Sequence, residues 1–263
     1  MKSLTLGLVA AGLLLLSGCA DSVDDQASYS SAEIADDGDF VLDYVEPQDA
    51  DYEEVYQILT EDGFYDDLLS DLNETFALPV DVLVSFDECG EENAFYDSEA
   101  ATITVCYELV KAYADRFQEE YQEDYTQEVI YAGFFTFFHE LGHALVDQYQ
   151  LPVVGREEDA VDAFAAVLML QAEEEDAVVA GMEQFDMDAE YEAEQDELPF
   201  WDEHSLSEQR VYNVSCLIYG SAPEDYADFI ESGWLPEDRA DGCEAEYAQA
   251  STSWDTLLYP YRN

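Results

Sequence analysis

The sequence predicts an α+β domain that is mostly helical and carries a small antiparallel sheet near its front. Three observations lead to this class. Apolar residues recur at helical spacing along most of the chain. Two short stretches, 80–86 and 102–107, are instead β-branched and apolar, as strands are. Hydrophobic residues make up 48% of the 263 residues, which is enough to fold one good-sized domain rather than remain disordered.

The front of the domain combines short helices with the two strands. Apolar residues at helical spacing in 55–59, and at every fourth position from 64 to 76, predict two short amphipathic helices. The stretches 80–86 and 102–107 then predict an antiparallel hairpin whose long connecting loop is rich in acidic and turn residues. A third helical repeat in 108–121 predicts the helix that follows the hairpin.

The middle of the chain predicts a buried helix followed by a second one. Residues 130–145 carry a wide apolar stripe, so this helix is expected in the centre of the domain. Pro152 and Gly155 end it. Residues 157–171 begin again as a helix, which is acidic in its first turn and apolar later. The short connection lets the second helix fold back against the first.

The last third of the chain predicts more helix. Residues 172–204 are acidic and irregular in pattern, with only weak helix signals. The sequence Ser-Leu-Ser-Glu at 205–208 fits a capping box, with Ser205 as the N-cap of a helix that reaches Tyr219. Pro236 opens the last helix, which is expected to run past Trp254.

The charge of the chain limits its partners. There are 64 acidic and 7 basic residues, a net charge of −57, and a field of this sign repels nucleic acid and anionic lipid. We therefore expect no nucleic-acid partner. Because the acidic residues are spread along the whole chain, a solvated halophilic-type surface is favoured over a patch that attracts cations or basic partners. Such a surface predicts lower stability at low salt.

The N-terminus predicts export rather than a folded element. A basic start and an apolar run to Leu16 are typical of a secretory signal, and the run is short for a membrane-spanning helix. The sequence Leu-Ser-Gly-Cys at 16–19 resembles the bacterial lipobox, which implies a signal peptide over 1–18 and a lipid on Cys19. An ordinary signal peptide or an uncleaved anchor are the alternatives. We expect a flexible acidic tether over 19–48 and the folded domain over 49–263. The protein would be a membrane-anchored lipoprotein, periplasmic or on the outer face.

Four cysteines remain after Cys19, and an even number in an exported protein predicts two disulfides. Three pairings are possible. We favour Cys89–Cys106 and Cys216–Cys243, because each pair would tie together one local unit. No two cysteines have the C-x-x-C spacing of a cysteine zinc site.

The chemistry of the chain concentrates in His139-Glu140-Leu141-Gly142-His143, an H-E-x-x-H sequence. Residues four apart lie on one face of a helix, so the two histidines can bind one metal ion. A catalytic zinc takes three protein ligands and leaves a position for water. Glu140 would border that position, where it can accept a proton from the attacking water and give it to the leaving amine. Gly142 either leaves room beside the metal or allows close helix packing.

The third ligand has to come from outside this sequence. We predict Glu158, on the following helix, with Glu157 and Asp159 as competitors. Adjacent positions differ by about 100° around a helix, so only one of the three faces the metal well. Asp162 lies one turn after Glu158 and can accept a hydrogen bond from the second nitrogen of a ligand histidine.

Two further residues have both a functional and a structural interpretation. His204 either reaches the cleft and stabilises the oxyanion that forms when water attacks a carbonyl, or it is a surface residue before Ser205. Arg210 either pairs with a buried acid or binds a substrate carboxylate.

Several segments resemble one family. The segment HELGHALVDQYQLPVVGREEDAVDAFA, the cysteine-flanked loop CGEENAFYDSEAATITVC and pieces of the C-terminal third resemble the bacterial family of putative metallopeptidases called domain of unknown function 4344. The resemblance extends from about residue 50 onward. It implies a zincin-like fold of the gluzincin sort, with His139, His143 and Glu158 as metal ligands and Glu140 as base. More distantly, the motif is similar to the repressor-cleaving peptidases of bacterial stress responses.

These observations predict a zinc-dependent peptidase that holds one Zn²⁺ ion, acts on a peptide or protein substrate outside the cytoplasm, and is monomeric. The alternative is a non-catalytic envelope lipoprotein that keeps the zinc as a structural element and acts as a binding module. A calcium-binding module is a third interpretation, but the sequence has no loop of the EF-hand form.

Overall fold

The fold was analysed in a computed structural model, which describes residues 35–61, 63–121, 125–195 and 197–263. The expected signal peptide over 1–18 and the expected lipid site at Cys19 lie outside the described residues. The helices and strands are, in chain order, β1 (Phe40–Tyr44), α1 (Glu53–Glu61), α2 (Phe64–Thr75), β2 (Val82–Asp87), β3 (Ala94–Asp97), β4 (Thr102–Cys106), α3 (Tyr107–Tyr121), α4 (Thr126–Tyr149), α5 (Glu157–Gln171), α6 (Glu175–Ala193), α7 (Ser207–Ser221), α8 (Asp228–Ser232), α9 (Glu237–Ala240) and α10 (Cys243–Leu258). The class is α+β and mostly helical, as predicted.

The sheet is mixed rather than antiparallel. Its order is β1-β2-β4-β3, with β1, β2 and β4 parallel and β3 antiparallel to β4. The predicted hairpin of 80–86 and 102–107 is therefore wrong, because β2 and β4 are parallel neighbours and β4 forms its hairpin with β3. The strand β3 was missed because it is only four residues long and lies in a stretch of acidic and turn residues. This arrangement leaves β3 at one edge of the sheet, beside α4.

The folded part of the chain begins earlier than the predicted boundary at residue 49. The strand β1 lies within the segment 19–48 that was expected to be a tether, and it pairs with β2 from Phe40 opposite Val82 to Tyr44 opposite Phe86. Phe40 is buried, and the side-chain amide of Asn73 binds both its backbone N–H and its carbonyl. The strand β1 was overlooked because its own sequence shows little periodicity.

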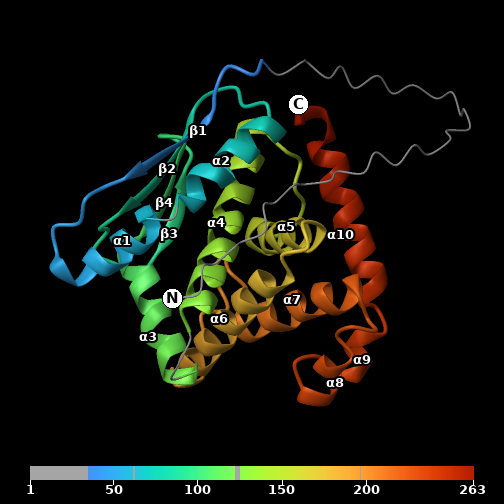
Figure 1. Cartoon of the computed structure of the whole chain (residues 1–263). Coiled ribbons are helices and arrows are strands. Elements are labelled where there is room, and N and C mark those ends of the chain that lie inside the picture. The colour runs from blue at the N-terminus through green and yellow to red at the C-terminus, as the bar shows by residue number, and fades with distance from the viewer. Residues whose placement is uncertain (1–34, 62, 122–124, 196) are drawn as a thin grey trace, which may run out of the picture.

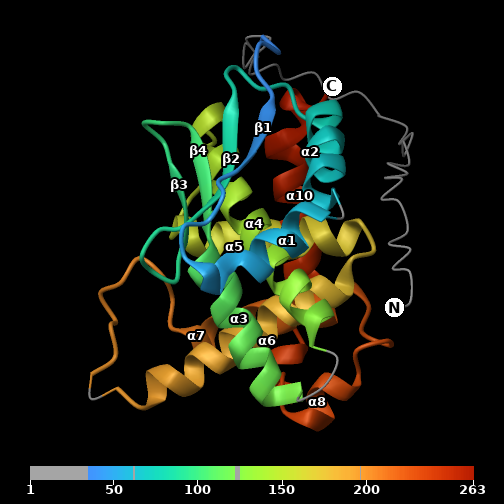
Figure 2. The same cartoon turned by 60° about the vertical axis from the view of Figure 1, so that its left-hand side comes forward.

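The helix α4 is the centre of the molecule. The sheet lies on one side of it, and α5, α7 and α10 lie on the other (Figure 1; Figure 2). Phe137, Leu141 and Leu145 of α4 are fully buried, and burial of each such side chain contributes about 1.5–3 kcal/mol. By length and composition α4 could cross a membrane, but 67% of its most apolar window is buried inside the fold. The apolar stripe predicted for this helix therefore serves the core.

The helix α6 replaces much of the irregular structure predicted for 172–204. Its buried side includes the small residues Ala177, Ala180 and Gly181, and a Cβ added to Gly181 would lie 2.3 Å from Cγ of Phe135 on α4. The two helices therefore approach closely at this glycine. Small residues give a weak amphipathic signal in the sequence, although they allow this tight contact.

Two helix boundaries near the C-terminus also differ from the prediction. The helix α7 begins at Ser207, and Glu192 of α6 accepts hydrogen bonds from its backbone N–H and its hydroxyl. Ser205 is therefore not the N-cap. The predicted last helix is divided into α9 and α10, with a break at Asp241 and Gly242, although Pro236 does precede the first piece as expected.

Both predicted disulfides are present. Cys89–Cys106 joins the loop after β2 to the end of β4, and Cys216–Cys243 joins α7 to the first residue of α10. Each disulfide connects neighbouring elements, as the preference for local pairing implied. The first one also fixes the start of the loop that leads into β3.

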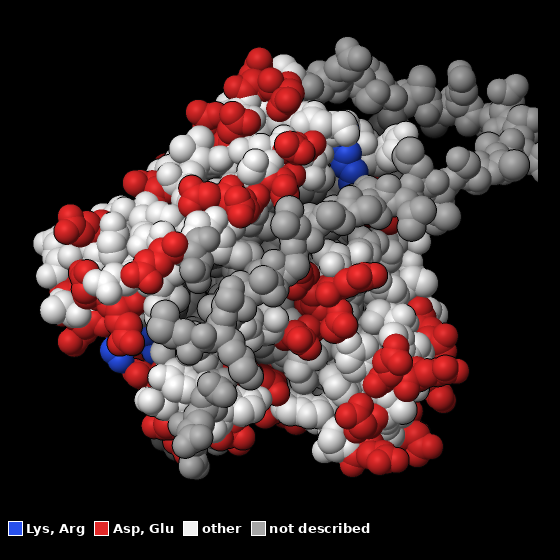
Figure 3. All heavy atoms as spheres, in the orientation of Figure 1, with Lys and Arg blue, Asp and Glu red and all other residues white. Residues whose placement is uncertain are grey.

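Acidic side chains cover much of the face shown in Figure 3, with few basic ones among them. Most of the basic residues that the structure describes are engaged with carboxylates. The ion pairs are Lys111–Asp115, Arg116–Glu92, Arg116–Asp188, Arg210–Asp162, Arg239–Glu246 and Arg262–Asp255. The remaining described one, Arg156, donates to the carbonyl of His204 at 2.9 Å.

Candidate metal centre

The helix α4 brings His139 and His143 together by local geometry. They lie one turn apart, and their ring centroids are 5.0 Å apart. The side chain of His139 is 8% exposed and that of His143 is 15% exposed. Because the opposite side of α4 is packed in the core, the backbone that carries the two rings has little freedom to move.

The helix α5 lies directly against this pair because of Gly142. A Cβ at this position would be 2.8 Å from Cβ of Val161 and 3.0 Å from Cδ1 of Phe164, both on α5. Of the two roles considered for Gly142, close helix packing is therefore the one that the geometry supports. The close approach also decides which acidic residue of α5 reaches the histidines.

Glu158 is the acidic residue that meets both histidines. Its Oε2 atom lies 3.1 Å from Nε2 of His139 and 3.3 Å from Nε2 of His143. Glu157 instead contacts Nδ1 of His143 at 2.8 Å, on the other side of that ring. His139, His143 and Glu158 offer donor atoms within 4.8 Å of one another and can hold a metal ion. Two ligands of a tetrahedral ion with bonds of about 2.0–2.1 Å are about 3.3 Å apart, which is close to these separations.

Asp162 fixes the orientation of His139, as its position one turn after Glu158 predicted. Its Oδ1 lies 2.8 Å from Nδ1 of His139. A carboxylate only accepts, so this contact places a proton on Nδ1, and Nε2, which faces Glu158, is the nitrogen that a metal would bind. Asp162 is itself held by Arg210, which donates from Nε and Nη2 at 2.7 Å each. Arg210 thus pairs with a buried acid, and its guanidinium also lies 3.7 Å from the ring centroid of Phe185.

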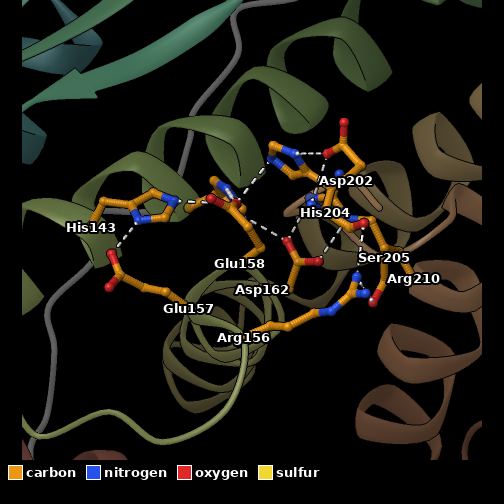
Figure 4. Close-up of polar contacts among 10 residues, drawn as sticks. His143, Arg156, Glu157, Glu158, Asp162, Asp202, His204, Ser205 and Arg210 are labelled. Atoms are coloured by element: carbon orange, nitrogen blue, oxygen red, sulfur yellow. Dashed lines mark hydrogen bonds and ion pairs between the residues drawn. The ribbon is translucent and has the colours of Figure 1, made fainter. Parts of the chain in front are cut away.

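His204 reaches the same place from the connection between α6 and α7. Its Nε2 lies 3.0 Å from Oε2 of Glu158, and its Nδ1 lies 3.2 Å from Oδ1 of Asp202. Figure 4 shows His143 and His204 approaching Glu158 from opposite sides. The side chain of His204 is 44% exposed, so it is the most accessible of the three rings. His204 therefore lies in the cleft, where it lines the cavities around the site.

Arg156 holds this connection in place and was not singled out in the sequence. It precedes α5, and its Nη1 donates to the carbonyl of His204 and, at 3.4 Å, to the hydroxyl of Ser205. The sequence contained one signal for it, since Arg156 is one of only 7 basic residues and lies two positions before Glu158. Its partner could not be identified, because it lies 48 residues away in the chain.

The charges of the site shift its pKa values strongly. Burial lowers the pKa of His139, but the hydrogen bonds to Asp162 and Glu158 outweigh burial and raise it to about 9. Burial raises the pKa of Glu158, but its contacts with the three histidines hold it well below its ordinary value. Burial likewise raises the pKa of Asp162, but Arg210 and His139 outweigh this effect and lower it. In the absence of a metal, the site is therefore held together by ion pairs.

Glu140 lies between two cavities. Its side chain is buried, and it has no hydrogen-bonding partner among the residues that the structure describes. A cavity of about 720 Å³ runs from His143 along β3 to Gln150, and a smaller one of about 140 Å³ lies on the side of Tyr113 and Gln184. Glu140 lines both. Burial raises its pKa, while the nearby His139 and His143 lower it, and the net shift is upward. A carboxyl group that lines a cavity and has a raised pKa is suited to accept and return a proton.

The comparisons with known proteins agree with this geometry. No curated protein and no solved structure matches the chain significantly. One family model matches residues 44–258, which include both disulfides and every residue of the candidate site described above. Its description is "Putative metallopeptidase". The chain belongs to this family, DUF4344.

Proposed function

We propose that the protein is a zinc-dependent peptidase with a zincin-like fold. The observation that carries this proposal is the convergence of His139, His143 and Glu158 beside the buried Glu140, at the junction of two cavities. Two imidazole nitrogens and one carboxylate oxygen are a ligand set of catalytic zinc sites. When bound, a zinc ion would polarise a substrate carbonyl and lower the pKa of water.

Glu140 is the proposed general base and acid. It lines both cavities, so a peptide bond placed between them would lie within its reach. Its raised pKa brings it closer to neutrality, where proton transfer in both directions is efficient. We assign it the removal of a proton from the attacking water and the delivery of that proton to the leaving amine.

His204 is the proposed stabiliser of the oxyanion. Its ring lies at the mouth of the site and contacts two carboxylates, Glu158 and Asp202. The hydrogen bond to Glu158 raises its pKa, and this outweighs the opposing effect of burial. A protonated ring can donate a hydrogen bond to a carbonyl oxygen as negative charge develops there.

The edge of the sheet offers a place for the peptide main chain. β3 pairs with β4 on one side, and its other side has no strand partner among the described residues. The larger cavity is lined by residues 93–96 and 98 together with α4. An extended peptide can add to such an edge by main-chain hydrogen bonds, which bind many sequences in one register. The peptide bond would then pass Glu140.

The alternative is a non-catalytic zinc protein that acts as a binding module. One observation favours it, since Nε2 of His204 lies 3.0 Å from Oε2 of Glu158, although His204 is not in the group of donors that lie within 4.8 Å of one another. Structural zinc sites have four protein ligands, whereas catalytic sites keep one position open. In this case His204 would close the site rather than assist catalysis.

Metal analysis beside a peptide-library digest separates the two functions. We expect the wild-type protein to hold about one zinc and to cleave peptides, and Glu140→Gln to keep the zinc while losing hydrolysis. Both proteins should be assayed in high salt, given the acidic surface. Zinc at this stoichiometry without cleavage by the wild type would favour the binding module. Under that alternative, His204→Ala would weaken zinc binding, whereas under the peptidase it would leave the zinc in place.

We further propose that the protein is exported and tethered to a membrane through lipid on Cys19. The lipobox-like sequence before Cys19 and the two disulfides support this, since disulfides persist in oxidising compartments. The test is incorporation of labelled fatty acid in the producing cell. Labelling should be present in the wild type and absent in Cys19→Ser, and a wild type without label would contradict the tether.

A further inference from the structure

The small cavity of about 140 Å³ lies on one side of Glu140, and most of the larger cavity lies on the other. At about 30 Å³ for each water, it holds the volume of four or five waters, so it accommodates one side chain rather than a stretch of main chain. Its walls include the apolar side chains of Leu109, Phe135 and Phe185. Its polar groups decide which side chain it accepts.

The first of these groups is the amide of Gln184 on α6. This side chain is more than nine-tenths buried, with 8% exposure. Its Nε2 donates to Asp188, and Asp188 also accepts from Nη1 of Arg116 at 2.8 Å. Because a carboxylate only accepts, the nitrogen of the amide must face Asp188 and the oxygen must face away. The Oε1 atom of Gln184 has no donor among the described residues, so it is an acceptor available to a ligand.

The second group is the hydroxyl of Tyr113 on α3. It lies 2.8 Å from Oγ1 of Thr136, and the Thr136 hydroxyl donates its own proton to the carbonyl of Ala132 at 3.1 Å. With the proton of Thr136 on the carbonyl of Ala132, Tyr113 donates to Thr136. The hydroxyl of Tyr113 then offers only lone pairs to the cavity.

Acidic side chains predominate in the larger cavity that leads to this one. Glu92 lies at the rim of the small cavity. Of the described residues, Asp147, Glu157 and Glu203 line the larger cavity beside it, and no lysine or arginine does.

Among the residues that the structure describes, the cationic groups in the wall of the small cavity each have a carboxylate partner. Arg210 makes two hydrogen bonds to Asp162, His139 also contacts Asp162, and His204 contacts Glu158 and Asp202. A ligand with an apolar stem and a positively charged donor would therefore satisfy the walls, the acceptors and the field together.

We propose that this cavity binds the side chain of a substrate lysine next to the scissile bond, with its ammonium group donating to Gln184 and Tyr113. The inference rests on the proposed peptidase function, and it names the substrate class of that site. An aspartate or glutamate would meet further acceptors. An apolar side chain would leave the Gln184 oxygen without a donor, and such an unpaired buried group is how an enzyme rejects an analogue that lacks a polar atom.

The test compares lysine with norleucine, which has the same stem but no ammonium group, at each position flanking the cleaved bond. We expect the wild type to prefer lysine at one of these positions by about 10-fold to 100-fold in kcat/KM. Gln184→Leu should bring the ratio close to one by losing lysine peptides rather than norleucine peptides. Tyr113→Phe should lower the ratio by a smaller factor, and it serves as the second variant if Gln184→Leu fails to fold.

Gln171→Leu is the matched control, because Gln171 lies on α5 and binds Ser251 away from the site. It should leave the lysine preference unchanged. Binding of the same peptides to zinc-loaded Glu140→Gln, followed by fluorescence anisotropy, gives a readout that does not need hydrolysis. Tighter binding of the lysine peptide supports the proposal even if the wild type cleaves nothing. The missing cleavage would then overturn the peptidase function instead. Cleavage without preference for lysine, or equal binding of the two peptides, would overturn this inference and leave the peptidase function intact.

Discussion

The two histidines of α4 and the histidine between α6 and α7 occupy the same site but are held there in different ways. His139 and His143 are 8% and 15% exposed and are fixed by a helix packed on several sides. His204 is 44% exposed, and hydrogen bonds from Arg156 and to Asp202 hold its segment. The helical pair is therefore set by local geometry and the core, whereas the position of His204 depends on a few polar contacts. This difference predicts how each part responds to change.

The largest effect is expected at Glu158, which links both parts. Glu158→Gln should weaken zinc binding by more than about 100-fold, because loss of a partner outside the ligand set already costs about 10–100-fold. Glu157→Gln is the matched control on the same turn. It contacts only the outer nitrogen of His143, so this change should cost at most the roughly 10–100-fold of a partner outside the ligand set. Zinc affinities measured with a competing chelator compare the two, and equal losses would mean that Glu157 shares the ligand role.

The second effect is the pH dependence of zinc binding. A ligand histidine must be neutral, whereas the metal-free protein holds His139 protonated with a pKa of about 9. Zinc must displace this proton, so its affinity should rise by about tenfold for each pH unit between pH 6.5 and 9. In the metal-free protein the same group stabilises the fold fully below its unfolded pKa of 6.5 and loses that contribution as the pH rises through 9. An affinity that does not change between pH 7 and 9 would show that His139 is already neutral.

The third effect tests whether close packing of α4 and α5 holds the helical pair. Gly142→Ala should lower the free energy of unfolding by about 1–3 kcal/mol, since the new Cβ would overlap Val161. Gly133→Ala, on the same helix, is the control. Its Cβ would meet only Oη of Tyr65 at 4.0 Å, so this change should be neutral or stabilise by up to about 1 kcal/mol. Urea unfolding of both variants measures the difference, and the packing argument fails if the two behave alike.

The smallest effect is expected at Arg156, which acts only on the segment of His204. Arg156→Ala should lower kcat/KM of the proposed hydrolysis by about tenfold, the value of one or two hydrogen bonds, while zinc content stays at the wild-type level. Arg239→Ala is the control, because Arg239 pairs with Glu246 away from the site. Loss of zinc in Arg156→Ala would contradict this assignment, since it would mean that Arg156 supports α5 and its ligand rather than His204.

The sequence was most informative where a few neighbouring residues of one helix determine where the side chains of the site lie. The spacing of His139 and His143 predicts a shared face, and Asp162 follows Glu158 by one turn, so its contact with His139 was also accessible. The choice between Glu157 and Glu158 could not be settled from the sequence, because it depends on the rotation of α5 against α4. Gly142 and Val161 set that rotation through a contact between two helices.

The sequence was least informative where an element depends on partners far away in the chain. The direction of β4 relative to β2 and the pairing of β1 follow from which strands meet in the sheet, and no local pattern records this. The helix α6 gave a weak signal because its buried side includes small residues, and one of them, Gly181, allows the close contact with Phe135 of α4.

By itself, therefore, the sequence determined the helical character of the domain, the two histidines with Glu140 between them, and the short-range disulfides. These depend on spacing along a helix and on proximity in the chain. Only the tertiary structure decided that Glu158 is the acid facing the histidines, that His204 joins them, and that Gln184 offers its oxygen to a second cavity. Each of these depends on the relative placement of separate helices, which the packing of side chains fixes after the helices have formed.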